Sequence, residues 1–596
     1  MPSELLVGYG SSTARECRPT QSELIDMHLV VIEDYVTAHF APPPPPASRP
    51  PPPAVDQTRH RVGIMPGMGS DTPSELLNLV RRGHAYSRRG EYGRAVEAFG
   101  DAIDLDPADA ELYFHRGNAL AAAGKHADAV ADFTRAIERN PDYAEAYHNR
   151  ATAEVDSGDL DPALADYTRS IELAPDDPDP VNGRAAVYSR QKNYDAAFAD
   201  YEAALALAPD TFRSYFNRGN ALSALGRHEE AVADYTHAVR VNPRHPRAYL
   251  YRALSLDALG KPDEAVADLT TALRLNPTGA EAFWQRARVW AERGEHEKAV
   301  ADFTWLLRID PKHPDALNLR GVEYAELREH AKAVADFTKA VALDPDDAAP
   351  RFNRGLSHVR TKNLPAAIDD FTEVIRLTPD DPAAFVQRGY ALHEQREAER
   401  AVADFTRAIE LNPEGGRAYF GRALVHRRKG DLPAALADAS AVIERNPKSD
   451  SAFNLRASIR YQLGDFATAL ADHLTAVEID PDDPATLNHV AWVRATCPRD
   501  DLRDGSAALR DALRACELTD HAAPGYVDTL AAAYAELGRF EDAVKWQQKA
   551  AELAPEASKP EYESRLALYR AGQPFRDAIA APAAEPTGET GEREAE

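Results

Sequence analysis

The sequence predicts an all-α solenoid of paired helices, because one short string recurs many times and always at the same spacing. The string AVADFT, with its near copies AVADYT and AVADLT, begins at residues 129, 231, 265, 299, 333 and 401. All of these start points are separated by multiples of 34 residues. A fixed period of about 20 to 50 residues is typical of arrays in which each unit packs only on its neighbours. Most of the chain is therefore one 34-residue unit repeated.

The composition argues against several classes of protein. The chain of 596 residues carries a formal net charge of −27 with a pI near 5.2, which disfavours a basic nucleic-acid interface and repels anionic membranes. Its three cysteines, Cys17, Cys497 and Cys516, are too few for a disulfide framework and favour a reducing compartment. Residues 1–19 lack the pattern of a signal peptide, and no run of about 18 apolar residues occurs. We therefore predict a cytoplasmic protein that binds neither nucleic acid nor membranes.

Residues 1–73 are predicted to be mostly disordered, with one helix at 20–40. Thr20 and Glu23 have the spacing of a capping box, and an apolar stripe follows at helical intervals. The stripe consists of Ile25, Leu29, Ile32, Val36 and Phe40. A proline-rich linker at 41–54, APPPPPASRPPPPA, is typical of a polyproline II spacer. The sequence leaves open whether the helix packs back on the array, binds a partner or is a leader with no role, and whether translation starts instead at Met65 or Met68.

From residue 74 to residue 483, twelve regular units follow one another without a break. We number each unit so that its closing proline is position 32. These prolines are Pro107, Pro141, Pro175, Pro209, Pro243, Pro277, Pro311, Pro345, Pro379, Pro413, Pro447 and Pro481. Position 8 is Gly or Ala, position 20 is always Ala, and position 24 is a bulky ring or leucine in most units. Small residues let two helices cross closely, and the bulky residue fills the space between them and the next unit.

Turn residues divide each unit into two helices. Position 15 is glycine in most units, which suits the left-handed residue that ends a first helix. The closing proline ends the second helix, and an aspartate or a second proline opens the next unit, as in PDDP at 379–382. Each unit is therefore predicted to be a helix, a short turn and a second helix.

An arginine and an aspartate recur in step along the array. Position 7 is arginine in all twelve units, and position 23 is aspartate in eleven of them. Pairing inside a unit leaves only Arg82 unmatched, whereas pairing with the preceding unit leaves three residues unmatched. We predict structural ion pairs within units rather than an anion-binding surface, because each arginine has its own counter-charge. The pairs include Arg116–Asp132, Arg150–Asp166, Arg218–Asp234 and Arg320–Asp336.

The pattern loosens after Pro481. Residues 484–572 are predicted to hold two divergent repeats and a capping helix, because the end of an array must present a polar outer face. Residues 573–596 are rich in Ala, Pro, Glu and Gly, and we predict a disordered acidic tail.

The pattern of positions 8, 11, 20, 24, 27 and 32 on a 34-residue period resembles the tetratricopeptide repeat, over about residues 76–557. The resemblance implies a right-handed superhelix of antiparallel helix pairs. It also implies that the first helix of each pair lines a concave groove, through positions 2, 5, 6, 9, 12 and 13. Co-chaperones of this family grip a carboxylate with a lysine at position 5. No unit of this chain has one, so such a clamp is not expected.

Position 5 of the units forms an apolar and aromatic series suited to an extended peptide or a helix. Asparagines at positions 6 and 9 could hydrogen-bond a peptide backbone, although they are also residues that this repeat tolerates. The richest polar cluster combines Arg213 and Arg247 with Asn217 and Asn220. The candidate groove residues are Phe114, Asn118, His148, Asn149, Arg213, Phe216, Asn217, Asn220, Arg247, Trp284, Phe352, Asn353 and Phe420.

No motif for catalysis or for a cofactor is present. The chain has no GxGxxG, P-loop, HExxH or CxxC, and its histidines lack the spacing of metal ligands. We predict a non-catalytic scaffold or adaptor that binds a protein or peptide in the groove, without a cofactor. The alternatives are a co-chaperone or assembly factor that shelters non-native clients, and, more weakly, a regulatory subunit of an enzyme. The sequence does not predict the oligomeric state.

Overall fold

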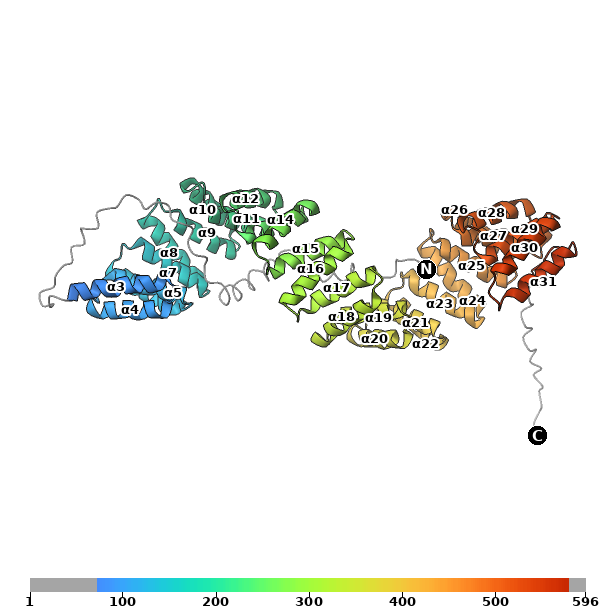
Figure 1. Ribbon diagram of the computed structural model, residues 1–596, viewed down its shortest axis with the longest axis horizontal. Coiled ribbons are helices and arrows are strands. Elements are labelled where there is room, and N and C mark those ends of the chain that lie inside the picture. Colours follow the sequence, from blue (N-terminus) through green and yellow to red (C-terminus); the bar gives the residue numbers. More distant parts are fainter. Residues whose placement is uncertain (1–71, 578–596) are drawn as a thin grey trace, which may run out of the picture. The chain divides into compact units, whose positions relative to one another are not determined.

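The computed structural model describes residues 72–577 of the chain (Figure 1). In this part the chain forms α-helices, labelled α3 to α31, together with one short 3-10 turn, and it contains no strand. The prediction of an all-α solenoid built from paired helices is thus confirmed. The predicted helix at 20–40 and the linker at 41–54 lie outside the described residues, as do residues 578–596.

The described chain divides into two compact units, with the boundary between Ala316 and Leu317, inside α17 (Pro314–Glu326). The preceding helices, all in the first unit, are α3 (Thr72–Arg88), α4 (Tyr92–Leu105), α5 (Ala110–Ala122), α6 (His126–Arg139), α7 (Ala144–Asp156), α8 (Leu160–Leu173), α9 (Pro178–Arg190), α10 (Tyr194–Leu207), α11 (Phe212–Ala224), α12 (His228–Val241), α13 (Pro246–Ala258), α14 (Pro262–Leu275), α15 (Ala280–Glu292) and α16 (His296–Ile309).

The elements after α17 belong to the second unit. They are α18 (His330–Leu343), α19 (Ala348–Arg360), α20 (Leu364–Leu377), α21 (Pro382–Glu394), α22 (Ala398–Leu411), α23 (Gly416–Lys429), α24 (Leu432–Arg445), α25 (Asp450–Gln462), α26 (Phe466–Ile479), α27 (Pro484–Thr496), the 3-10 turn η2 (Asp500–Leu502), α28 (Gly505–Leu518), α29 (Pro524–Glu536), α30 (Phe540–Leu553) and α31 (Lys559–Arg570).

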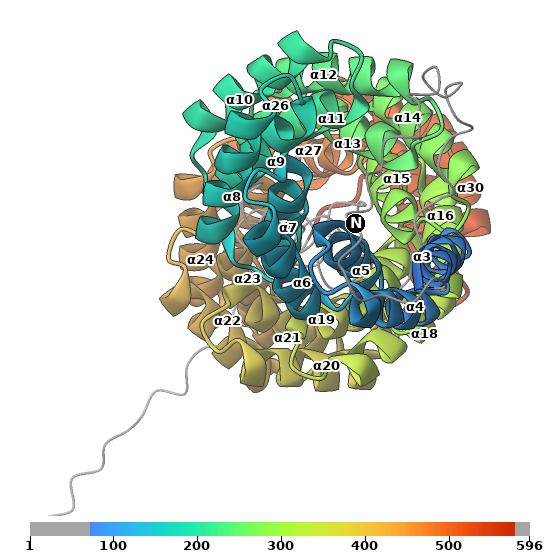
Figure 2. The same cartoon turned by 90° about the vertical axis from the view of Figure 1, so that its left-hand side faces the viewer.

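Each repeat of the sequence corresponds to one pair of helices, such as α5 with α6 or α11 with α12. In the first unit, the first helices α7, α9, α11, α13 and α15 lie on the inner side (Figure 2). Their partners α8, α10, α12, α14 and α16 lie outside them. From α7 to α16, the inner side of this unit is therefore built from the first helix of each pair.

The turn between paired helices keeps one backbone conformation even where the sequence lacks glycine. Gly124 at position 15 has a φ of 73°. Four repeats replace this glycine, and the replacements, Lys192, Arg328, Lys362 and Arg396, still have φ values of 59–65°. A left-handed conformation costs a non-glycine residue roughly 1–2 kcal/mol, so the packing of the paired helices imposes it.

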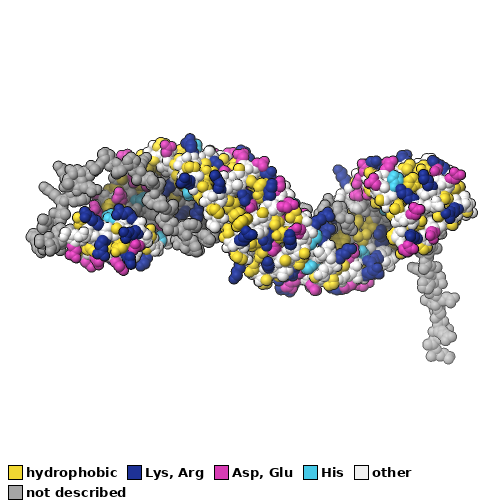
Figure 3. All heavy atoms as spheres, viewed as in Figure 1, with side chains coloured by type: hydrophobic (Ala, Val, Ile, Leu, Met, Phe, Trp, Pro, Cys, Tyr) yellow, Lys and Arg dark blue, Asp and Glu magenta, His cyan; other side chains and the backbone are white. Residues whose placement is uncertain are grey.

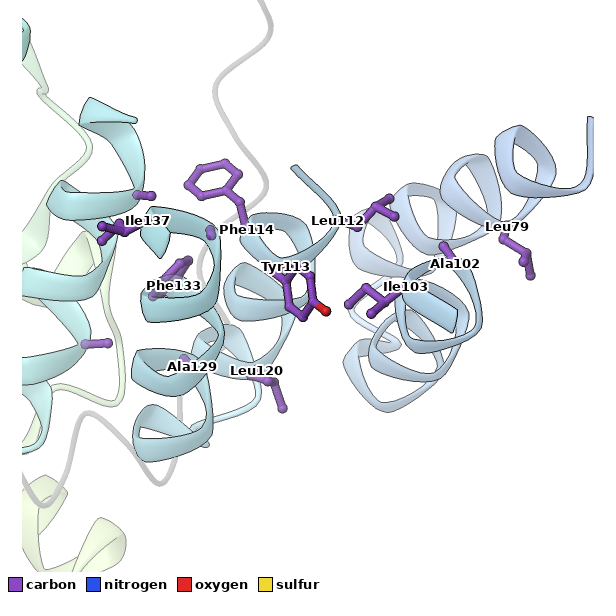
Figure 4. Packing of buried hydrophobic residues seen from close by; sticks show 13 residues of the cluster. Leu79, Ala102, Ile103, Leu112, Tyr113, Phe114, Leu120, Ala129, Phe133 and Ile137 are labelled. Carbon is purple, nitrogen blue, oxygen red and sulfur yellow. The ribbon is translucent and has the colours of Figure 1, made fainter. Parts of the chain in front are cut away.

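The bulky residue at position 24 fills the junction between repeats. Phe133 is fully buried in the cluster shown in Figure 4, and a Cβ added to Gly117 would lie 2.8 Å from its ring. Phe405, also fully buried, faces Gly389 of its own repeat and Gly421 of the next one in the same way. The small residues thus admit a ring that joins each pair of helices to its neighbour.

The prediction that disorder begins at residue 573 is wrong for residues 573–577. This segment follows α31 and packs against the array: the Phe575 ring lies 5.7 Å from the Trp492 ring, and the Asp577 amide donates to the Thr496 carbonyl at 2.9 Å. A ring-to-ring contact and a satisfied carboxylate offset the entropy lost on ordering, which composition alone does not reveal.

Candidate functional site

The arginine at position 7 binds the aspartate at position 23 of the same repeat in all eleven repeats that have both. In each pair, Nε and Nη2 of the arginine donate to the two carboxylate oxygens at 2.5–3.0 Å, and the aspartate is only 2–9% exposed. The predicted pairs Arg116–Asp132, Arg150–Asp166, Arg218–Asp234 and Arg320–Asp336 all have this geometry.

Several of these arginines also bind the preceding repeat. Nη1 of Arg150 donates to Oγ1 of Thr134 at 3.0 Å, and Nη1 of Arg184 does the same with Thr168. The hydrogen bond to Asp200 raises the pKa of Arg184, although burial acts in the opposite direction. These guanidinium groups are therefore engaged inside the protein, which supports a structural role over the binding of external anions.

The aromatic residues at position 5 differ in exposure, so they do not form a uniform surface. Phe114 is 8% exposed and Phe352 is 3% exposed, and each packs on the position-24 ring of its own repeat. These two residues are core residues, and predicting them as groove contacts is wrong. Phe216, Trp284 and Phe420 keep part of their surface open. Position 5 alone cannot distinguish the two cases, because burial depends on neighbouring residues at other positions.

Most of the predicted polar groove residues already have partners. Asn149 donates to Asn118 at 2.7 Å, and Asn353 donates to Asn318 at 3.1 Å. The His148 ring packs edge-on against Tyr167, and burial lowers the pKa of its imidazole. These contacts stabilise the junctions between helices. They also leave fewer hydrogen-bond donors and acceptors of the same side chains available to a ligand.

The structure brings one subset of the candidates together, on α11 and α13. The Phe216 ring lies 5.4 Å from Phe212, 5.4 Å from His245, 5.7 Å from Tyr251 and 6.0 Å from Tyr235. We call these five residues the α11–α13 aromatic cluster. Phe212, His245 and Tyr251 were not among the predicted groove residues. In the sequence, these three residues share one feature, an aromatic ring. Phe212 and His245 stand at positions 1 and 34 of one repeat, and Tyr251 stands at position 6 of the next repeat.

Two cations flank this cluster. Arg213 follows Phe212, and Arg247 comes two residues after His245; both side chains are exposed. Neither side chain forms a hydrogen bond or an ion pair with any other residue in the range 72–577. Nearby, Asn220 accepts a hydrogen bond from the Tyr235 hydroxyl at 2.8 Å, while Asn217 is only partly buried. The cluster therefore combines partly open rings with unpaired positive charge.

Trp284 forms a smaller site on α15, where it stacks on His313 at 5.1 Å and meets Phe303 edge-on at 5.9 Å. Phe420 lies on α23 in the second unit, partly buried against a small apolar cluster around Ala423. The partly open rings Phe216, Trp284 and Phe420 thus lie on three different helices, α11, α15 and α23.

Three features of the described residues bear on metal binding, thiol reactivity and membrane spanning. Among residues 72–577, no group of three or more His, Cys, Asp or Glu side chains is placed to hold a metal ion. Cys497 and Cys516 are buried, and burial raises the pKa of the Cys516 thiol to about 11, which disfavours the reactive thiolate. None of the described helices is long and apolar enough to cross a membrane. Acidic and basic side chains are interspersed on the face in Figure 3.

Several solved structures are similar to this chain. A tetratricopeptide repeat protein from Parabacteroides merdae is 20% identical, with a TM-score of 0.35, over 42% of this chain and 99% of that chain. The Cut9–Hcn1 hetero-tetramer of the APC/C gives 15% identity and a TM-score of 0.36, over 83% of this chain and 96% of that chain. Yeast Tom70 gives 18% identity and a TM-score of 0.31, over 76% of this chain and 96% of that chain. The comparison with curated proteins finds no match.

Models of the tetratricopeptide repeat match the chain along most of the array. One such model matches residues 80–144, 148–212, 252–314, 318–382, 386–449 and 428–484, which together cover more than half of the chain. Two further tetratricopeptide models match residues 181–244 and 527–557. These matches agree with the 34-residue period and with the paired helices. The chain belongs to the tetratricopeptide repeat family.

Proposed function

We propose that this chain is a non-catalytic scaffold that binds an extended peptide or a short helix at the α11–α13 aromatic cluster. The observation that carries the proposal is the combination of partly open rings with the two unpaired cations Arg213 and Arg247. Tetratricopeptide repeats support a role in protein–protein interaction in general. Figure 2 shows α11 and α13 on the inner side of the first unit, which supports a binding site on that side.

The chemistry of the cluster favours a particular kind of peptide. Rings bind apolar or aromatic side chains by burying their area, and each exposed arginine attracts a carboxylate. We therefore expect a ligand with an apolar anchor and at least one acidic residue beside it. The strong negative charge of the whole chain disfavours most other acidic proteins, so the two arginines also contribute to selectivity.

Affinity purification with the full chain, read by mass spectrometry, tests the proposal. The variant Phe216→Ala with Trp284→Ala is expected to lose the partner that the wild-type chain captures, with unchanged helicity by circular dichroism. Trp305→Ala is the matched control, because Trp305 is a half-exposed ring on the outer helix α16. Retention of the partner by the double variant would place the site elsewhere.

A co-chaperone would behave differently in the same samples. It would suppress the aggregation of unrelated unfolded proteins without saturable affinity for one partner. Cytoplasmic localisation and the absence of cofactors, nucleic acid and membranes remain part of the proposal.

A further inference from the structure

The segment that follows α31 runs back along the second unit toward earlier repeats. Arg576 pairs with Glu536 at the end of α29 at 2.7 Å, and the Phe575 ring contacts the Trp492 ring of α27 at a tilt of 44°. Asp577 then lies between α27 and α25: its Oδ2 accepts a hydrogen bond from Trp492 Nε1 at 3.1 Å and another from the Tyr461 hydroxyl at 3.0 Å. In five residues the segment crosses from α29 to α25.

A polar cavity of about 460 Å³ lies on the next helices in this direction. It is lined by His393 of α21, by Leu424, Arg427 and Arg428 of α23, and by Ser458 and Gln462 of α25. The cavity and the anchor of Asp577 share helix α25, because Gln462 lines the cavity and the preceding residue, Tyr461, holds Asp577. All of its lining residues belong to positions 9, 12 and 13 of their repeats, which the family pattern assigns to the groove.

The cavity has positive charge that nothing in the described chain neutralises directly. Arg428 donates to the His393 carbonyl at 3.0 Å, an uncharged acceptor. The Arg427 side chain forms no hydrogen bond or ion pair among residues 72–577, and burial lowers its pKa. Burial lowers the pKa of His489 on α27; Asp483 opposes this shift, and Arg427 adds a smaller lowering effect. A half-buried guanidinium without an acceptor is an incomplete site for an anion.

The chain that continues from Asp577 carries the complementary charge. Residues 578–596 contain one basic residue, Arg593, and five acidic residues: Glu585, Glu589, Glu592, Glu594 and Glu596. Glu585 is eight residues beyond Asp577, a distance that an extended chain covers up to about 28 Å. The sequence beyond the anchored segment therefore carries the charge that complements the basic cavity.

We propose that the cavity formed by α21, α23 and α25 is a carboxylate-binding site, and that the acidic residues 585–596 of the same chain occupy it. The covalent connection gives the acidic stretch an effective concentration of the millimolar order at this site. An acidic segment of another protein must displace it, so the tail acts as a built-in competitor on the inner helices of the second unit. This site does not depend on the binding proposed at α11 and α13.

Fluorescence anisotropy with a labelled synthetic peptide of residues 578–596 tests this proposal. The reference protein is the full chain in which Glu585, Glu589, Glu592, Glu594 and Glu596 are all changed to Gln, here named the neutral-tail chain. The peptide is expected to bind the neutral-tail chain at least 10-fold more tightly than the wild-type chain, whose own tail competes. Adding Arg427→Gln and Arg428→Gln to the neutral-tail chain is expected to weaken binding at least 10-fold.

The matched control for the cavity is Arg400→Gln with Arg407→Gln, which removes the same charge from α22, a second helix of its pair. Both arginines form only i,i+3 ion pairs there, with Glu397 and Glu410. With this control, the affinity of the labelled peptide is expected to stay within two-fold of its value for the neutral-tail chain. A second control leaves the protein unchanged and replaces the five Glu residues of the peptide with Gln. This neutral peptide is expected not to bind the neutral-tail chain.

Two results would overturn the proposal. Equal affinity of the labelled peptide for the neutral-tail chain and its Arg427→Gln, Arg428→Gln variant would show that the cavity is not the site. Equal affinity for the wild-type and neutral-tail chains would show that the tail does not occupy the cavity. In that second case, the cavity is free for an acidic segment of another protein or for another part of this chain.

Discussion

The guanidinium of Arg184 binds both carboxylate oxygens of Asp200, with Nε and Nη2 donating at 2.7 and 2.9 Å. Its remaining nitrogen, Nη1, donates to Thr168 of the preceding repeat at 3.0 Å. One side chain therefore holds the two helices of its own repeat together and sets its position against the neighbour. Buried pairs of this kind add little net stability over apolar residues, but they are costly to break singly.

Removing one partner of this pair is expected to destabilise its repeat more than removing both. Asp200→Leu leaves the guanidinium without its acceptor, and we expect the local free energy of unfolding of α9 and α10 to fall by about 2–3 kcal/mol. Arg184→Leu combined with Asp200→Leu should recover most of this loss, as the apolar residues Leu530 and Trp546 occupy these positions in the last repeat. Native-state hydrogen exchange measures this locally, because repeat arrays do not unfold in one step.

Arg227→Ala is the control for this experiment. Arg227 forms a comparably short pair with Glu230, at 2.7 Å, but both side chains are about half exposed. Its loss should leave the local stability almost unchanged, because solvent screens an exposed pair. A loss at Asp200→Leu as small as this would contradict the structural role of the buried pairs.

The junction at Phe405 is expected to reject even one added methyl group. A Cβ at Gly421 would overlap the Phe405 ring of the preceding repeat, so Gly421→Ala forces the two repeats apart. We expect a loss of about 1–3 kcal/mol. Gly93→Ala is the control, because the new Cβ at this helical site has no neighbour within 4 Å and should stabilise α4 by about 0.5–1 kcal/mol. Chemical denaturation followed by circular dichroism distinguishes the expected loss of stability in Gly421→Ala from the expected gain in Gly93→Ala.

The proposed peptide site should depend on charge. Arg213→Gln with Arg247→Gln is expected to weaken binding of the captured partner about 10-fold, since two charge-assisted contacts are lost. The effect should shrink as salt screens the remaining attraction. Arg240→Gln with Arg274→Gln removes the same charge from the outer helices α12 and α14 and should leave the affinity unchanged. Isothermal titration at two salt concentrations measures the partner's affinity for each of the two double variants. Equal losses of affinity in the two variants would indicate only a nonspecific charge effect.

Stability should fall in acid because of a buried histidine. Burial, together with the neighbouring His489, lowers the pKa of His473 from its ordinary value of 6.5 to about 3. Between these two pH values the unfolded chain binds a proton here that the folded chain does not, so stability decreases as the pH falls. At pH 5 this amounts to at most about 2 kcal/mol relative to pH 7.

His473→Gln should flatten this pH dependence, because glutamine does not titrate and can still hydrogen-bond Asn454, which His473 contacts at 2.8 Å. Urea denaturation at pH 7 and pH 5 measures the difference between the wild-type chain and the variant. The same acid sensitivity in both would assign the effect to other groups.

The repeated positions made the array predictable. Alanine at position 20, a ring at position 24 and arginine with aspartate at positions 7 and 23 recur in identical surroundings, so one physical reason applies to every copy. Exposure at position 5 was not predictable in this way. Phe352 is buried and Phe216 is partly open, because the residues around them at positions 1, 6 and 34 change from repeat to repeat.

The sequence by itself determined the all-α class, the pairing of helices and the family, since these follow from local periodicity and short-range turns. Only the tertiary structure showed that Phe216 meets Tyr251 of the next repeat, and that Asp577 reaches Tyr461 across more than one hundred residues. Such contacts depend on how successive repeats stack and on where the end of the chain returns. No periodicity encodes them, because each occurs only once.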